Sequence, residues 1–106
     1  MKVVINVCYG GFRVSESGLE LLKKNAPYMF DEDGDMTDEY YADDYAQLRI
    51  DRVFINLVEN HRAEVEGEQS HLKVVNLPRE TTDYRIEEDD GFETLLYVVG
   101  GKIYEI

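Results

Sequence analysis

The sequence predicts one domain of the α+β class, in which strands and helices follow one another along the chain. Three observations support this prediction. The 106 residues suffice for a single hydrophobic core. Two short runs rich in β-branched residues flank a helical periodicity, and the last third of the chain alternates between apolar and polar residues. We expect the order strand, helix, helix, strand, followed by an antiparallel β-meander.

The first strand is predicted from Val3 to Tyr9, where a nearly continuous apolar run indicates burial on both faces. Gly10 and Gly11 end this run and favour a tight turn. A short helix should follow, ending near Asn25. Its N-cap is either Ser17, which forms a capping-box pattern with the glutamate three residues later, or Ser15.

The second helix has the clearest periodicity in the chain. Apolar residues recur at offsets of zero, three, four, seven and eight, at Ile50, Val53, Phe54, Leu57 and Val58. We expect this helix to extend from near Thr37 to Asn60, with a break in the forties left open. The polar stretch from Arg62 to Ser70 should form the loop that follows.

The remaining strands complete the fold. Leu72 to Leu77 resembles the first strand in composition, so we expect the two to form a parallel pair connected across the helices. Tyr84 to Glu87, Phe92 to Val99 and Lys102 to Ile106 should form the meander. Turn signals at residues 89–91 and 100–101 separate its strands.

The charge of the chain excludes several classes of function. Lys and Arg number 11 against 23 Asp and Glu, which gives a net charge of -12. Direct binding to nucleic acid or to an anionic membrane is disfavoured, because both require basic residues. The single cysteine, Cys8, cannot form an intramolecular disulfide and sits in an apolar run typical of a buried position. With no signal-peptide core or apolar membrane span, we expect a cytoplasmic location.

The acidity is concentrated between Asp31 and Asp44, which carry eight carboxylates and no Lys or Arg. Tyrosines within and beside this stretch could act as anchors of a protein interface. The predicted partner-binding residues are Asp31, Asp33, Asp35, Asp38, Glu39, Tyr40, Tyr41, Asp43, Asp44 and Tyr45. The alternative is a solvated face that keeps the protein in solution. The first five residues suggest a calcium loop, but the glycine and the bidentate carboxylate required by an EF-hand are misplaced.

A second candidate site is the turn between the first strand and the first helix. Gly10 and Gly11 would let backbone N–H groups approach a ligand, and Arg13, Ser15 and Ser17 could donate to a phosphate or carboxylate. The alternative is a structural turn and a helix cap, because the spacing matches no nucleotide-binding fingerprint. Neither a catalytic group nor a metal or cofactor site is predicted, since no acid–base or Cys–His pair is evident.

Three stretches resemble a group of small bacteriophage and prophage proteins that have no assigned activity. They are Met1 to Phe12 with Ser15 just beyond, Leu72 to Pro78, and the turn Ile86 to Gly91. The resemblance implies a phage or prophage origin, a host-cell location and an accessory role. We therefore expect a non-enzymatic protein whose acidic face binds a basic surface of a host protein, as an anti-defence or nucleic-acid-mimicking inhibitor would. The alternative function is binding of a small phosphorylated ligand at the Gly10-Gly11 turn, and exposed tyrosines would also allow a dimer.

Overall fold

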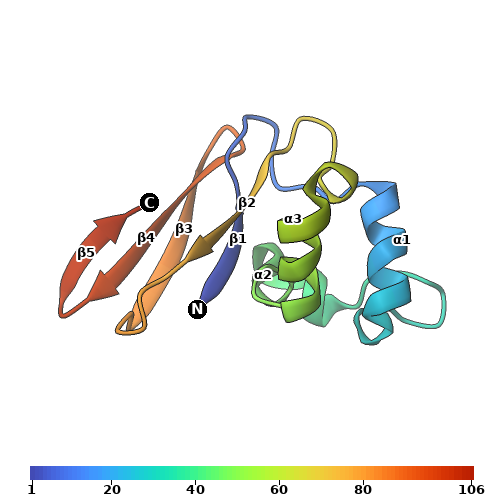
Figure 1. Cartoon of the computed structure of the whole chain (residues 1–106), viewed down its shortest axis with the longest axis horizontal. Helices are drawn as coiled ribbons and strands as arrows, with labels where there is room; N and C mark the ends of the chain where they lie inside the picture. Colours follow the sequence, from blue (N-terminus) through green and yellow to red (C-terminus); the bar gives the residue numbers. More distant parts are fainter.

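The computed structural model describes all residues from 1 to 106 and confirms the α+β class. Helices lie at one end of the elongated molecule, which measures 44 × 26 × 24 Å, and the β-meander lies at the other (Figure 1). Strands β1 and β2 separate the two ends. The chain order is β1 (Lys2–Asn6), α1 (Glu16–Asn25), the 3-10 helix η1 (Pro27–Met29), α2 (Asp38–Arg49), α3 (Arg52–Val65), β2 (Leu72–Asn76), β3 (Asp83–Asp89), β4 (Phe92–Val99) and β5 (Lys102–Glu105).

The predicted parallel pairing of the first and fourth elements is wrong, because β1 and β2 are antiparallel. Val3 lies opposite Val75, and the ladder extends from Lys2 to Asn6. A single crossover helix would return the chain for a parallel strand. Here three helices, α1, α2 and α3, lie between the strands along the chain, and the chain comes back to the end where β1 finished. The Val7 N–H donates to the His71 carbonyl at 2.9 Å, just before β2 begins.

The predicted helix from Thr37 to Asn60 is two helices, α2 and α3. The Asp51 carboxylate accepts hydrogen bonds from the N–H groups of Val53 and Phe54, so it caps a new helix at the point where the periodic apolar pattern starts. The first helix uses Ser15 as its cap, because the Ser15 hydroxyl accepts from the Gly18 N–H at 2.9 Å. No helix is both long and apolar enough to cross a bilayer.

The C-terminal meander is confirmed, with β4 between β3 and β5 in one antiparallel sheet. Tyr84 lies opposite Tyr97, and Tyr97 lies opposite Tyr104 on the other edge. Gly100 and Gly101 connect β4 to β5 with φ angles of 59° and 78°. Two consecutive positive φ angles favour glycine, so the two-residue turn fixes the register of the last strand.

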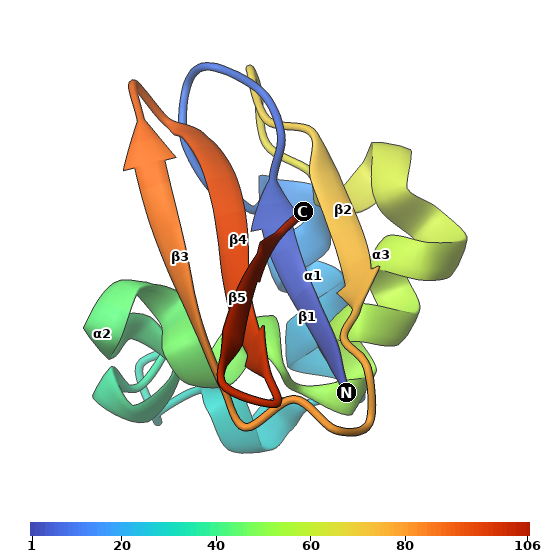
Figure 2. The same ribbon diagram turned by 90° about the vertical axis from the view of Figure 1, so that its left-hand side faces the viewer.

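Two apolar clusters cover opposite sides of β1. Val4 belongs to a cluster of 12 buried residues formed mainly by α1, α2 and α3. Val3 and Ile5 belong to a smaller cluster that includes Val75 and Leu95 of the neighbouring strands. Viewed from the meander end, β3, β4, β1 and β2 lie side by side with the helices behind them (Figure 2). This arrangement explains why β1 is apolar at nearly every position, since both of its faces are buried.

Candidate functional site

The carboxylates of the acidic segment form an exposed surface, which we call the acidic face. All eight of its acidic residues are exposed, and only Asp44 lies within ion-pair distance of a cation, at 3.3 Å from Arg49. Its members are Asp31, Glu32, Asp33, Asp35, Asp38, Glu39, Asp43 and Asp44. The negative charge of this segment is therefore almost entirely uncompensated. The fold places its two parts differently, with Asp35 near α1 and with Asp43 and Asp44 near β3.

The first part of the acidic face is a tight loop held by Asp31. One oxygen of its carboxylate accepts hydrogen bonds from the N–H groups of Asp33 and Asp35, at 2.9 and 3.0 Å. A bridge between Phe30 and Met36 closes the base of the loop. Asp31 therefore serves the loop itself, while Asp33 and Asp35 are available to a partner. No group of three or more acidic, His or Cys side chains is placed to hold a metal ion.

The second part of the acidic face lies on an unusual break in α2. Asp43, Asp44 and Tyr45 have φ angles of 53°, 57° and 63°, after an extended Ala42. Three consecutive left-handed residues without glycine cost free energy, roughly 1–2 kcal/mol each, which the surrounding contacts must offset. The Asp44 carbonyl accepts a hydrogen bond from Arg49 Nε at 2.8 Å, so Arg49 helps to hold this conformation.

An aromatic groove of about 480 Å³ lies beside the acidic face. Tyr41 and Tyr45 meet edge to face in it, with ring centroids 5.4 Å apart. The ammonium group of Lys23 lies 5.7 Å from the centroid of the Phe30 ring on the same wall. The full lining is Val14, Leu19, Lys23, Phe30, Gly34, Asp35, Met36, Tyr41 and Tyr45. Apolar contact area and carboxylates are thus adjacent on the surface.

Tyrosines next to the acidic face keep their protons well above neutral pH. Desolvation, the hydrogen bond that the Tyr28 hydroxyl donates to Asp51 at 2.7 Å, and the charge of that carboxylate raise the pKa of Tyr28 to about 12. Desolvation also raises the pKa of Tyr40, helped by the charges of Glu39 and Asp51. Desolvation raises the pKa of Tyr45 as well, against the opposing charges of Arg49 and Arg13. These hydroxyls can therefore donate hydrogen bonds at neutral pH.

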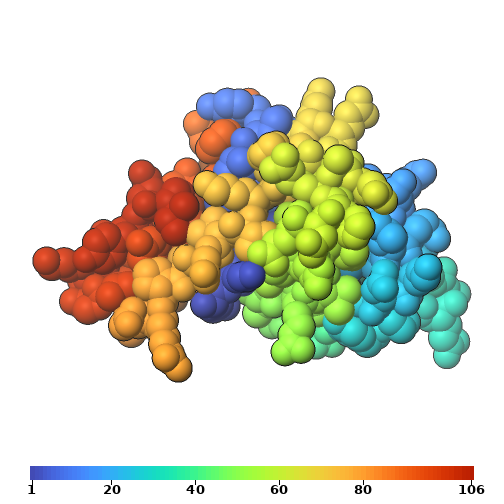
Figure 3. Space-filling model, in the orientation of Figure 1, coloured from blue at the N-terminus to red at the C-terminus, as the bar shows by residue number.

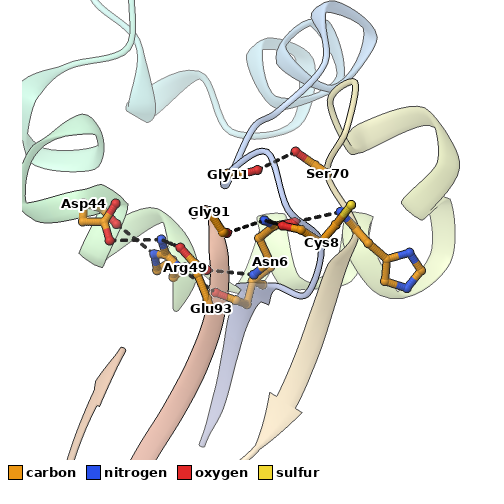
Figure 4. A network of polar contacts seen from close by, with 10 residues as sticks. Asn6, Cys8, Gly11, Asp44, Arg49, Ser70, Gly91 and Glu93 are labelled. Carbon is orange, nitrogen blue, oxygen red and sulfur yellow. Dashed lines mark hydrogen bonds and ion pairs between the residues drawn. The ribbon is translucent and has the colours of Figure 1, made fainter. Parts of the chain in front are cut away.

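A buried ion pair lies directly beneath the acidic face. Arg49 Nη1 and Nη2 each lie 2.7 Å from one carboxylate oxygen of Glu93 in β4, and both side chains are almost fully buried (Figure 4). The remaining guanidinium donors bond to the Val4 carbonyl, the Asp44 carbonyl and the Asp44 carboxylate. All five donors of the guanidinium are used. The Phe12 ring also lies against Arg49, 4.1 Å from its central carbon.

Asn6 extends this polar network across the strands. Its backbone N–H donates to Glu93 at 2.7 Å, and its amide nitrogen donates to the carbonyls of Cys8 and Gly91 (Figure 4). Its amide oxygen accepts from the His71 N–H at 2.8 Å. Asn6 is fully buried with every side-chain donor and acceptor paired, so it joins the ends of β1 and β2 to the turn before β4.

Sequence reasoning did not identify Asn6, Arg49 and Glu93 as a network. A partial signal was present, because Asn6 is the polar residue within the first apolar run. Glu93 also shares a strand face with the buried Leu95, two residues away. Arg49 offered no such signal, since it precedes a helix break that periodicity does not reveal.

The predicted ligand-binding residues of the first turn lie against other parts of the chain. The Gly10 N–H points to the Asp90 carbonyl at 3.4 Å, and a side chain on Gly91 would collide with the backbone of Gly10 and Gly11. The Ser15 hydroxyl caps α1 and donates to the Glu64 carbonyl, whereas Arg13 and Ser17 are exposed. These contacts account for the glycines and for Ser15 within the fold, and phosphate binding there stays a prediction. Cys8, predicted as a buried strand residue, lies beyond the end of β1 and is half-buried.

Comparisons with protein-family models, with curated proteins and with solved structures found no match. The geometry of the site is therefore the basis for a functional assignment.

Proposed function

We propose that this chain is a non-enzymatic accessory protein whose acidic face binds a basic surface of a host protein. The observation that carries the proposal is the uncompensated charge around an aromatic groove. Seven of the eight exposed carboxylates have no cationic partner within the chain, and a basic partner would supply the missing charges. A phage or prophage origin, implied by the resemblance of the N-terminal and C-terminal stretches, is consistent with a host target.

The groove adds specificity to the charge. Arginine side chains of a partner could pair with Asp33 or Asp43 and lie flat on the rings of Tyr41 or Tyr45. Arg49 provides the same geometry inside the fold, where it combines a carboxylate with the ring of Phe12. A surface that binds nucleic acid is rich in such arginines. We therefore propose competition with nucleic acid as the mode of inhibition.

The test is capture of host proteins by the tagged chain at low and high salt, followed by mass spectrometry and by affinity measurement with the purified target. We expect a basic protein whose affinity falls steeply with salt and which nucleic acid displaces. The variant for this test reverses Glu32, Asp33, Asp35 and Asp43 to lysine. It spares Asp31, because that carboxylate holds the loop.

A matched control reverses four acidic residues away from the acidic face, Glu68, Glu80, Glu88 and Asp89, all of which are exposed. Both variants change the net charge by the same amount. The proposal requires that the first variant loses binding while the control retains most of it. Equal losses would show that net charge alone drives the association, and unchanged binding by the first variant would rule out the acidic face.

A further inference from the structure

The outer edge of the meander is an exposed strand with apolar side chains. All four residues of β5 are exposed, and the exposed fraction reaches 70% for Ile103 and 43% for Tyr104. This strand projects from the end of the molecule opposite the helices (Figure 3). Unpaired strand edges offer backbone donors and acceptors to another strand, and proteins usually cover or charge them. Here the edge is neither covered nor strongly charged.

The hydrogen bonds of β4 and β5 show which backbone groups face outward. Leu95 and Ile106 exchange both possible bonds, with N···O distances of 3.3 and 2.9 Å. Pairs in an antiparallel ladder alternate between bonded and non-bonded. From this pair and the register of β4 and β5, Lys102 and Tyr104 direct their N–H and C=O groups toward β4. Ile103 and Glu105 therefore direct theirs away from the sheet, toward an incoming strand.

We propose that β5 pairs with β5 of a second copy of this chain, in an antiparallel arrangement centred on Ile103. A two-fold axis perpendicular to the sheet keeps equivalent side chains of both copies on the same face of the sheet. Odd-numbered residues then lie opposite odd-numbered residues, and even-numbered opposite even-numbered. In this register the two Ile103 residues form a bonded pair. Lys102 lies opposite Tyr104 of the second copy, and Glu105 lies opposite Gly101 of the second copy.

The other symmetric registers fit less well. Centring on Tyr104 places Ile103 opposite Glu105, and centring on Glu105 places like charges directly opposite each other, which destabilises a pair. In the register on Ile103, apolar residues meet at the centre. Tyr104 already stacks on Tyr97, with ring centroids 5.4 Å apart. Lys102 of the second copy lies opposite Tyr104 in this register and places a cation beside the two rings.

Electrostatics favour this edge over the rest of the surface as a self-contact. A chain with a net charge of -12 repels its copy over most orientations. The charges of Lys102 and Glu105 cancel within β5, and the acidic loop at residues 31–36 lies at the opposite end of the long axis (Figure 1). Pairing through β5 thus leaves the acidic loops of both copies at the outer ends of the dimer, while Asp43 and Asp44 lie nearer the meander, beside Tyr84 and Ile86 of β3.

The test is the molar mass of the untagged chain, measured by sedimentation equilibrium over a range of concentrations at moderate salt. We expect reversible doubling of the mass. Ile103→Pro removes an outward N–H without affecting a donor that binds β4, and should weaken the dimer by about tenfold or more, because each copy loses a ladder bond. Ile103→Lys places like charges opposite each other and should also weaken it. Thermal unfolding under monomeric conditions checks that both variants fold.

Ile106→Lys is the matched control, because it adds the same charge three residues later, at a position whose backbone groups bond to Leu95 of β4. In the proposed register this change leaves the dimer intact. A monomer at every concentration, or a dimer that Ile103→Pro and Ile103→Lys leave unchanged, would overturn the proposal. A dimer weakened by Ile106→Lys and strengthened by Ile103→Lys would replace the register with the one centred on Tyr104.

Discussion

The buried ion pair and the acidic face meet at Arg49 and use carboxylates in opposite ways. The Glu93 side chain is 3% exposed and binds the guanidinium through both oxygens, whereas the Asp44 side chain is 65% exposed and makes one longer contact at 3.3 Å. Inside the protein a charge requires a partner with good geometry. On the surface water screens the charge, so unpaired carboxylates can accumulate there at little cost. We conclude that Glu93 serves the fold, whereas Asp44 and its acidic neighbours face the solvent.

The largest expected effect is the loss of the buried pair. Glu93→Gln leaves the buried Arg49 charge with only the longer, solvent-exposed contact to Asp44, and we expect a loss of about 3–5 kcal/mol in the free energy of unfolding. Asp44→Asn removes an exposed contact to the same arginine and should cost about 0–1 kcal/mol. Urea denaturation at neutral pH measures both. Similar costs for the two variants would contradict the distinction between interior and surface carboxylates.

If Glu93→Gln does not fold, the double variant Arg49→Met with Glu93→Leu provides a second measurement. Removing both charges abolishes the unpaired ion, although the Val4 carbonyl, the Asp44 carbonyl and the Asn6 N–H lose their partners. We expect the double variant to be more stable than either single variant. The opposite order would mean that the pair contributes more than its desolvation costs.

The next largest effect concerns two asparagines, one buried and one exposed. Asn6→Ala removes a buried side chain that makes three hydrogen bonds, to the carbonyls of Cys8 and Gly91 and from the N–H of His71. Because these groups then lack a partner, we expect a loss of about 1–3 kcal/mol in the free energy of unfolding. Asn76 occupies an exposed position at the end of β2. Asn76→Ala should change the free energy of unfolding by less than about 0.5 kcal/mol. Urea midpoints measure the difference, and a small cost at Asn6 would show that water replaces its bonds.

The same contrast explains how much of the structure the sequence could predict. Helices, strands and the meander follow from local periodicity and turn residues, so the element types and the strand from Phe92 to Val99 were confirmed. Residues of the acidic face were predictable because they are adjacent in sequence. The predicted parallel direction of β1 and β2 was wrong, because the pairing direction depends on how the helices between the two strands pack together. Arg49 and Glu93 lie 44 residues apart and meet only in the folded chain.

A smaller effect concerns the left-handed break at Asp43. Because Asp43 has a φ of 53°, we expect Asp43→Gly to be more stable than Asp43→Ala by about 1–2 kcal/mol. Gln47 is an exposed helical residue four positions later in α2. There the order should reverse, with alanine more stable than glycine by about 1 kcal/mol. Alanine preferred at both positions in urea denaturation would show that residue 43 is helical in solution.

The smallest effect concerns Tyr28, an exposed tyrosine that donates a hydrogen bond to Asp51, and it needs high pH to appear. A folded-state pKa of about 12 for Tyr28, against an ordinary value of 10.0, means that the folded protein holds this proton more tightly than the unfolded chain. The resulting stabilisation is complete below the ordinary pKa and is lost as pH rises through the folded pKa. Ultraviolet titration of tyrosinate should show a late-titrating group that Tyr28→Phe removes. Asp51→Asn preserves a helix cap but removes the carboxylate charge, so it should lower the pKa of Tyr28. An unchanged titration in Asp51→Asn would assign the shift to desolvation alone, and would mean that the carboxylates near the acidic face do not influence the tyrosines beside them.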